Sequence, residues 1–141
     1  MNMFLIFLAF LIYCVRVQSI EISEHFLDIP TVACLERLKI DKHIVVNNLD
    51  ENFYLPEVNP ELNEFLACSA KSREFLDENG KIKFHILENN IKNIVLPFLN
   101  KNHLKETSHE IAEKCKTVED KNLGVQMVKL HNCIVDSVSN K

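Results

Sequence analysis

The hydrophobic pattern divides the chain into one leading apolar run and a series of short amphipathic stretches. Apolar side chains occupy almost every position of residues 3–15. A run of this length matches the hydrophobic region of a secretory signal and is too short to cross a bilayer as a helix. Arg16 and a small-residue ending at Ser19 follow it. We therefore expect a signal peptide over residues 1–19 and a single secreted helical domain over residues 20–141, located in an extracellular fluid.

After the leading run, apolar positions recur three and four residues apart, as in amphipathic helices. Asn59 and Pro60 form the clearest helix start, an N-cap followed by proline at the first helical position. Asp41 is expected to be an N-cap, and Pro30 is expected to kink or split the first helix. Residues 77–80 (Asp-Glu-Asn-Gly) predict a turn. The expected helices cover residues 23–38, 41–49, 60–76, 84–93, 104–117 and 120–138.

Composition agrees with an all-α fold. The chain has two glycines, four prolines and no tryptophan, whereas a β-sandwich needs turn residues at about every 8 to 12 positions. Without Arg16, 15 basic residues stand against 20 acidic residues, a net charge near −5. Nucleic acids and anionic membranes bind basic surfaces. We therefore expect no nucleic-acid partner.

The cysteines predict disulfides. Cys14 would leave with the signal peptide, and four cysteines remain: Cys34, Cys68, Cys115 and Cys133. An even number in a small secreted chain predicts two disulfides. No pair has C-x-x-C spacing, which argues against a redox site or a zinc ribbon. Three pairings are possible, and the spacing alone does not choose between them.

Patterns for catalysis or metal binding are missing from the sequence. If Gly80 is aligned with the invariant glycine of an EF-hand loop, Phe75 and Ile86 fall where oxygen ligands are required. The six histidines are scattered, without an H-E-x-x-H motif. Two glycines are too few for a glycine-rich phosphate loop. We expect no enzyme activity, no metal and no cofactor, although six histidines also raise the hypothesis of acid-triggered ligand release.

Two segments carry a family resemblance. The run from Phe65 to Cys68 and the run FLDENGKIKF from Phe75 to Phe84 resemble the middle of insect odorant-binding proteins of the pheromone/general odorant-binding type. That family has six cysteines on six helices. By their spacing, the four cysteines match the first, third, fourth and sixth of the family pattern.

Glu64 and Gly124 then occupy the second and fifth cysteine positions. The loss of this pair is typical of the four-cysteine Minus-C type. The resemblance implies the pairing Cys34–Cys68 and Cys115–Cys133. Because the third bridge would be missing, and because glycine is a poor helix residue, we expect the last helix to be loose near Gly124. Cysteines at positions 64 and 124 should then raise the melting temperature.

The resemblance also implies a compact six-helix fold with an internal hydrophobic cavity that carries odorants, pheromones or other lipophiles. The expected partner is a small hydrophobic molecule, with a membrane odorant receptor reached only indirectly, and the chain is expected to be a monomer or a weak homodimer. The main alternative is a secreted helical cytokine-like signalling protein without a cavity. Apolar residues at helical spacing are the candidates for the cavity lining, although each could equally be ordinary core: Leu62, Phe65, Leu66, Leu87, Ile91, Phe98, Ile111, Met127 and Leu130.

Overall fold

A computed structural model of the chain describes residues 27–139 and residue 141. The expected signal peptide and the start of the first expected helix lie outside the described residues. The described part is helical, with a single isolated β-bridge between Leu76 and Ile82. This confirms the all-α class. The helical segments are α2 (Ile29–Leu38), α3 (Ile44–Asn48), α4 (Pro60–Ser72), α5 (Phe84–Asn90), the π-helix η2 (Ile91–Val95), α6 (Leu96–Phe98), the 3₁₀-helix η3 (Asn102–Thr107), α7 (Ser108–Cys115) and α8 (Leu123–Ser139).

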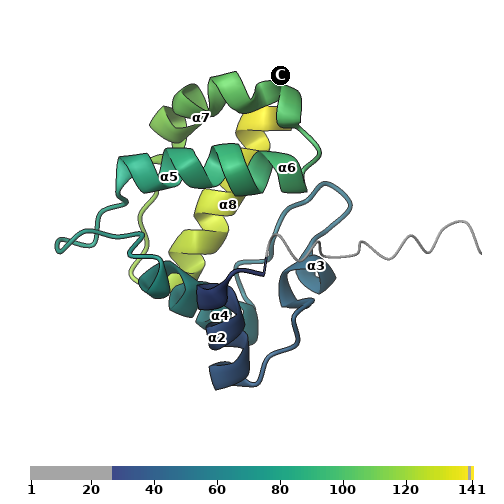
Figure 1. Cartoon of the computed structure of the whole chain (residues 1–141), viewed down its shortest axis with the longest axis vertical. Coiled ribbons are helices and arrows are strands. Elements are labelled where there is room, and N and C mark those ends of the chain that lie inside the picture. Colours follow the sequence, from purple (N-terminus) through teal and green to yellow (C-terminus); the bar gives the residue numbers. More distant parts are fainter. Residues whose placement is uncertain (1–26, 140) are drawn as a thin grey trace, which may run out of the picture.

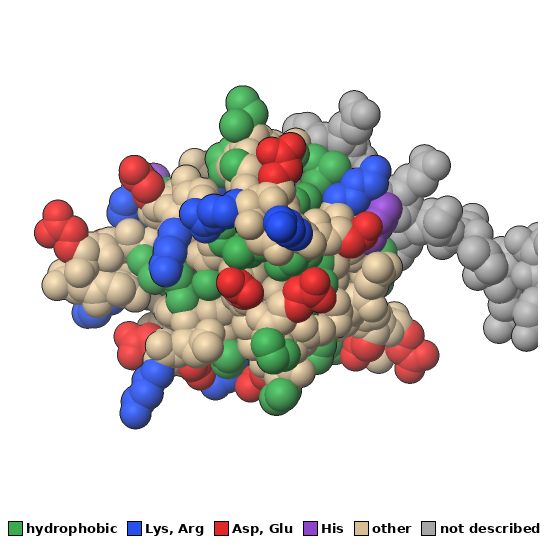
Figure 2. All heavy atoms as spheres, turned by 90° about the horizontal axis from the view of Figure 1, so that it is seen from below, with side chains coloured by type: hydrophobic (Ala, Val, Ile, Leu, Met, Phe, Trp, Pro, Cys, Tyr) green, Lys and Arg blue, Asp and Glu red, His purple; other side chains and the backbone are tan. Residues whose placement is uncertain are grey.

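Helix α8 is the axis of the fold. It packs against α4 at one end and α7 at the other, while α2 and α3 pack on α4, and α5 packs on α7 (Figure 1). Two hydrophobic clusters result, one around α2, α3 and α4 and the other around α5, η2, α6 and α7. Val128 of α8 belongs to the first cluster and Leu130 to the second. The end of the molecule near α2 presents charged side chains of both signs with apolar side chains between them (Figure 2).

Local capping explains where the helices begin. The Asn59 side chain accepts a hydrogen bond from the Leu62 backbone N–H at 3.1 Å, and Pro60 opens α4, as predicted. Asp28 caps α2 in the same way through Thr31 N–H, also at 3.1 Å. Pro30 therefore lies in the first turn of α2, where its missing N–H costs no intrahelical bond. The prediction that Pro30 kinks or splits a helix over residues 23–38 stays a prediction, because the start of that range lies outside the described residues.

Other boundaries differ from the prediction. Helix α3 starts at Ile44 with His43 as N-cap, and the Asp41 carboxylate accepts the His43 N–H at 2.7 Å one turn before the helix. Helix α8 starts at Leu123, because the Asn122 side chain accepts the Val125 N–H at 3.1 Å. Polar side chains that bond to nearby backbone groups favour turns and caps over helix interiors. The helices are therefore shorter at these ends than the hydrophobic pattern suggested.

Two disulfides tie the elements together. Cys34–Cys68 joins α2 to α4, with 6.0 Å between the Cα atoms. Cys115–Cys133 joins α7 to α8, with 5.8 Å between the Cα atoms. This is the pairing that the family resemblance implied. Each disulfide therefore holds the helices of one hydrophobic cluster.

The backbones of α4 and α8 approach each other closely at Gly124. Gly124 is buried, and a Cβ atom added there would overlap the backbone carbonyl of Asn63 on α4. Only glycine allows two backbones to approach this closely. The expectation of a loose α8 near Gly124 does not fit this packing, because the helices are in direct contact at this position.

Candidate functional site

An apolar pocket of about 230 Å³ lies between the two hydrophobic clusters. Helices α2, α3, α4, η2, α6 and α8 all contribute side chains to it. Its walls are mainly aliphatic and aromatic, which is the usual character of sites for small organic molecules. The apolar lining residues are Leu27, Val45, Val46, Phe65, Leu66, Ala70, Phe75, Ile94, Val95, Phe98, Met127, Leu130 and Ile134.

Helix α8 supplies one wall through its periodicity. Met127, Leu130, His131 and Ile134 follow the i, i+3, i+4, i+7 spacing that places side chains on one helix face. Helix α4 repeats this spacing with its own stripe, which begins at Leu62. Side chains from both stripes therefore line the same pocket.

A π turn supplies another wall. In η2 the Leu96 N–H donates to the Ile91 carbonyl, five residues back instead of four. Pro97 follows, and a proline ring in a regular α-helix clashes with the carbonyl four residues earlier. Single π turns inside α-helices occur often at functional sites. Here the turn leaves Ile94, Val95 and Phe98 on the pocket wall.

The nine residues that the sequence suggested as lining divide between pocket and core. The pocket contains Phe65, Leu66, Phe98, Met127 and Leu130. The other four are packed in the hydrophobic clusters and do not reach the pocket: Leu62, Leu87, Ile91 and Ile111.

Sequence reasoning missed several lining residues. Val45 and Val46 come from the short helix α3, and Ile94 and Val95 come from the π turn, beyond the predicted end of that helix. Ile134 lies on the same α8 stripe as Met127 and Leu130, and this periodicity was the one signal that could have included it.

Six polar side chains complete the described lining: Thr31, Lys42, Ser69, Arg73, Asn90 and His131. Arg73 follows α4 as its C-cap residue. Its Nη2 donates to Asp28 Oδ1 at 2.9 Å and to Thr31 Oγ1 at 2.8 Å, and its Nε donates to Ser69 Oγ at 3.3 Å. Arg73, Thr31 and Ser69 therefore form one polar corner between α2 and α4.

His131 is the titratable imidazole of the pocket. Its Nε2 lies 2.8 Å from the Phe53 carbonyl oxygen, which can only accept, so Nε2 carries the hydrogen. Burial lowers the pKa of His131 below its usual value, and the hydrogen bond to Phe53 opposes this only in part. The neutral form is therefore favoured near neutral pH.

A loop passes over α8 beside this histidine. We call residues 50–55 the α3–α4 strap. The Asn132 side chain on α8 pairs with both backbone groups of Leu55 at 2.9 Å, and the Tyr54 hydroxyl donates to Asp136 at 2.6 Å. The same hydrogen bond raises the pKa of Tyr54. Together with the bond from His131, these contacts fix the strap to the outer face of α8.

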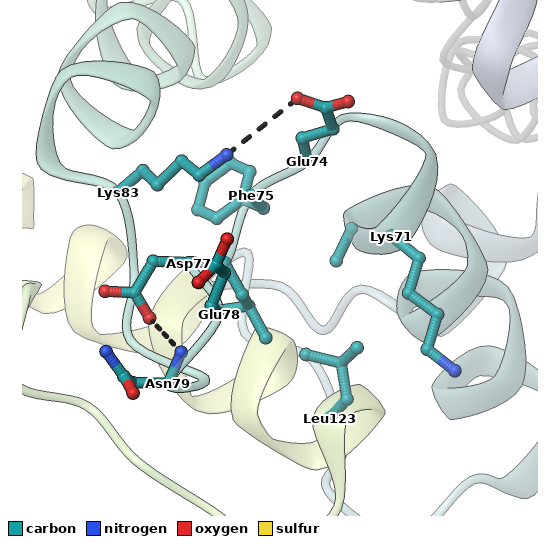
Figure 3. A pocket seen from close by; sticks show the side chains of 10 residues that line it. Lys71, Glu74, Phe75, Asp77, Glu78, Asn79, Lys83 and Leu123 are labelled. Atoms are coloured by element: carbon teal, nitrogen blue, oxygen red, sulfur yellow. Dashed lines mark hydrogen bonds and ion pairs between the residues drawn. The ribbon is translucent and has the colours of Figure 1, made fainter.

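A second hollow, of about 790 Å³, lies between the end of α4, the turn at residues 77–80 and Leu123 of α8 (Figure 3). Its walls carry Lys71, Glu74, Asp77, Glu78 and Lys83, and the Glu74 carboxylate lies 3.8 Å from the Lys83 ammonium. Asp77 Oδ1 accepts the Asn79 N–H at 2.8 Å (Figure 3). Charged walls of both signs favour water over a hydrophobic ligand.

Metal and membrane features are missing from the described part of the chain. No three His, Cys, Asp or Glu side chains of residues 27–139 group as metal ligands would. Nor does any helix in that range combine the length and apolar character of a membrane span.

Residues 21–137 match the model of the PBP/GOBP family. A search of curated protein sequences found no match, and a search of solved structures found none. Proteins of the PBP/GOBP family are secreted, soluble carriers that bind small hydrophobic ligands and are not enzymes. The family match over most of the chain, the helical fold and the two disulfides lead to one conclusion: this chain belongs to the PBP/GOBP family.

Proposed function

We propose that the chain is a secreted carrier that holds a small hydrophobic molecule, such as an odorant or pheromone, in the pocket between α2, α3, α4, η2, α6 and α8. The single observation that carries the proposal is the apolar pocket itself, whose lining comes from both hydrophobic clusters. Family membership supports the same function. Binding of this kind needs no catalytic group, metal or cofactor.

The pocket suits a small ligand. Its volume of about 230 Å³ lies below the roughly 300 to 1,000 Å³ of most sites for drug-sized molecules. Each 100 Å² of apolar ligand surface removed from water contributes roughly 2.5 kcal/mol. Part of that gain offsets the loss of ligand motion on binding. The remaining free energy is enough for reversible carriage.

Secretion and subgroup are part of the proposal. A signal peptide over residues 1–19 and two disulfides suit an oxidising extracellular fluid. Glu64 and Gly124 at two expected cysteine positions support the four-cysteine Minus-C type. We propose a monomer or weak homodimer that meets a membrane odorant receptor only indirectly, through the ligand it delivers.

Titration with a fluorescent hydrophobic probe tests the carrier function. Wild-type protein should bind one probe molecule per chain and saturate. Met127→Trp fills the pocket and should weaken binding more than tenfold. Leu123→Trp, on the same helix but outside this pocket, should leave affinity unchanged. Failure of the wild-type protein to saturate would reject the carrier and favour a helical signalling protein.

A further inference from the structure

We propose that the pocket selects hydrophobic carboxylates, the class of medium-chain fatty acids, and that the guanidinium of Arg73 binds the carboxylate. This inference rests on the proposed carrier function and adds the chemistry of the ligand's head group. Its basis is the position of a fixed, partly unsatisfied arginine on the wall of an otherwise apolar pocket.

The orientation of Arg73 is set by its neighbours. Asp28, Thr31 and Ser69 accept hydrogen bonds from Nη2 and Nε. Nη1 makes no hydrogen bond to any described residue, so within that part of the chain two of the five guanidinium N–H donors remain for a ligand. A planar guanidinium that is already held in place loses little entropy when it binds a carboxylate.

The charges around the pocket favour an anion. The carboxylate of Asp28 forms an ion pair with Arg73 and balances its charge, since Asp28 Oδ2 lies 2.9 Å from Arg73 Nη2. Lys42 lines the same pocket, is exposed and forms no ion pair with a described residue. No acidic side chain is among the described lining residues. The lining therefore carries a net positive charge, which attracts a carboxylate and repels an ammonium group.

Partial exposure of the site lowers the desolvation cost of an anionic head group. A carboxylate in a dry interior would lose its hydration at great cost. The Arg73 side chain is 21% exposed, so a carboxylate bound there keeps some contact with water. The hydrocarbon tail can then contact the apolar walls, including Phe98 and Met127. A neutral alcohol or ester would gain a hydrogen bond without the added strength of a charge-assisted pair.

Four ligands with the same ten-carbon chain test the inference: decanoate, methyl decanoate, 1-decanol and decylamine. Each competes with the fluorescent probe at pH 7.5 and low salt. Decanoate should bind about tenfold tighter than the ester or the alcohol, equivalent to about 1.4 kcal/mol, and decylamine should bind most weakly. Raising the salt concentration should weaken the binding of decanoate and leave the binding of decanol unchanged, because salt screens partly exposed charges.

Variants identify the residue responsible. Arg73→Gln should abolish the preference for decanoate and keep decanol affinity within about twofold. Arg37→Gln is the matched control, since Arg37 lies on α2 outside the pocket and donates to Cys68 Sγ at 2.8 Å. Lys42→Gln removes an exposed charge that has no hydrogen-bond partner among the described residues. It should reduce decanoate affinity about twofold or more even if Arg73→Gln fails to fold.

The outcomes separate the two proposals. Wild-type protein that binds the probe but holds decanoate no tighter than decanol overturns the carboxylate preference and leaves the carrier function standing. Preference for decanoate that persists in Arg73→Gln overturns the role of Arg73. Protein that binds neither probe nor any of the four ligands overturns the carrier function itself.

Discussion

Gly124 shows how one residue sets the distance between two helices. The family resemblance implied a cysteine position here by spacing, and the structure places α8 directly against the Asn63 backbone of α4. The two helices are therefore in close backbone contact at the position where a disulfide would otherwise join them. The facing residue is Asn63, and Glu64 is exposed to solvent.

Replacement of Gly124 by alanine should therefore destabilise the protein. Alanine is a better helix residue by about 1 kcal/mol, but its Cβ overlaps a carbonyl that belongs to a helix backbone. Overpacking of this kind costs roughly 1 to 3 kcal/mol. Urea unfolding should show a net loss for Gly124→Ala. The exposed Glu64→Ala should change stability by less than about 0.5 kcal/mol.

The same overlap changes the expectation for an added disulfide. Cysteine at position 124 carries the overlapping Cβ, and Glu64 is exposed to solvent and is not among the atoms nearest to Gly124. The oxidised double variant Glu64→Cys, Gly124→Cys should melt no higher than wild type, contrary to the gain expected from the sequence. A clear rise in the melting temperature of the oxidised form would show that α4 and α8 can separate at little cost.

His131 makes stability depend on pH. Burial lowers its pKa in the folded state, whereas in the unfolded chain an ordinary histidine has a pKa of about 6.5. Between these two values the unfolded chain binds more protons, so acid favours unfolding. The contribution of His131 is fully present above about pH 6.5 and is lost as the pH falls from there toward the folded pKa.

His131→Gln should reduce this pH dependence, because the glutamine amide can still donate to the Phe53 carbonyl but does not titrate. The change in urea midpoint between pH 7.5 and pH 5 should be smaller in this variant than in wild type. His103→Gln, at an exposed position, is the control and should keep the wild-type change. Equal pH dependence in all three proteins would contradict the assignment to His131.

Among the elements, the α3–α4 strap depends most on a single side chain. Asn132 bonds to both the N–H and the carbonyl of Leu55, a residue only 4% exposed. Asn132→Ala removes both bonds and leaves two backbone groups without partners, which should cost about 2 to 3 kcal/mol. Chemical unfolding measures the loss. The control Asn89→Ala, at an exposed position of α5, should be nearly neutral.

At the element scale, the start of α4 could be predicted and the π turn could not. Asn59 followed by Pro60 determines the start of α4 through contacts within four residues, so the sequence contains the whole signal. The π turn at Ile91–Val95 lets the chain continue past Pro97 while the segment packs against α7. That compromise depends on tertiary contacts, and the prediction accordingly ended the helix too early, at residue 93.

Periodicity also could not separate pocket from core. Leu62 and Phe65 lie on one stripe of α4, yet Leu62 is fully buried in the core while Phe65 reaches the pocket. Both positions face the protein interior, so their hydrophobic pattern is the same. The packing of the neighbouring elements around each position decides which side chains contact the core and which line the pocket.

For the whole molecule, α8 connects two halves, one around each hydrophobic cluster, and each half contains one disulfide. Cys34–Cys68 lies in the half formed by α2, α3 and α4, which contributes the polar corner of the pocket. Cys115–Cys133 lies in the other half and attaches α7, which contributes no described lining residue, to α8. The two disulfides should therefore contribute alike to stability but differently to ligand binding.

Paired replacements by serine test this asymmetry. The closed loops have sequence separations of 34 and 18 residues, for which the chain-entropy model gives roughly 3 to 4 kcal/mol each, slightly more for the longer loop. Both variants should melt at clearly lower temperatures. Loss of Cys34–Cys68 frees α2, which carries Thr31 and, at its cap, Asp28, so the corner that holds Arg73 loosens.

Probe affinity of the folded variants should then separate them. Cys34→Ser, Cys68→Ser should bind at least fivefold more weakly than wild type, and Cys115→Ser, Cys133→Ser should stay within about twofold, because a tenfold change requires about 1.4 kcal/mol of lost interaction. Circular dichroism before each titration establishes that both variants are helical. Equal losses of affinity would mean that ligand affinity follows the stability of the whole molecule. The shape of the pocket would then not depend on the attachment of α2 to α4.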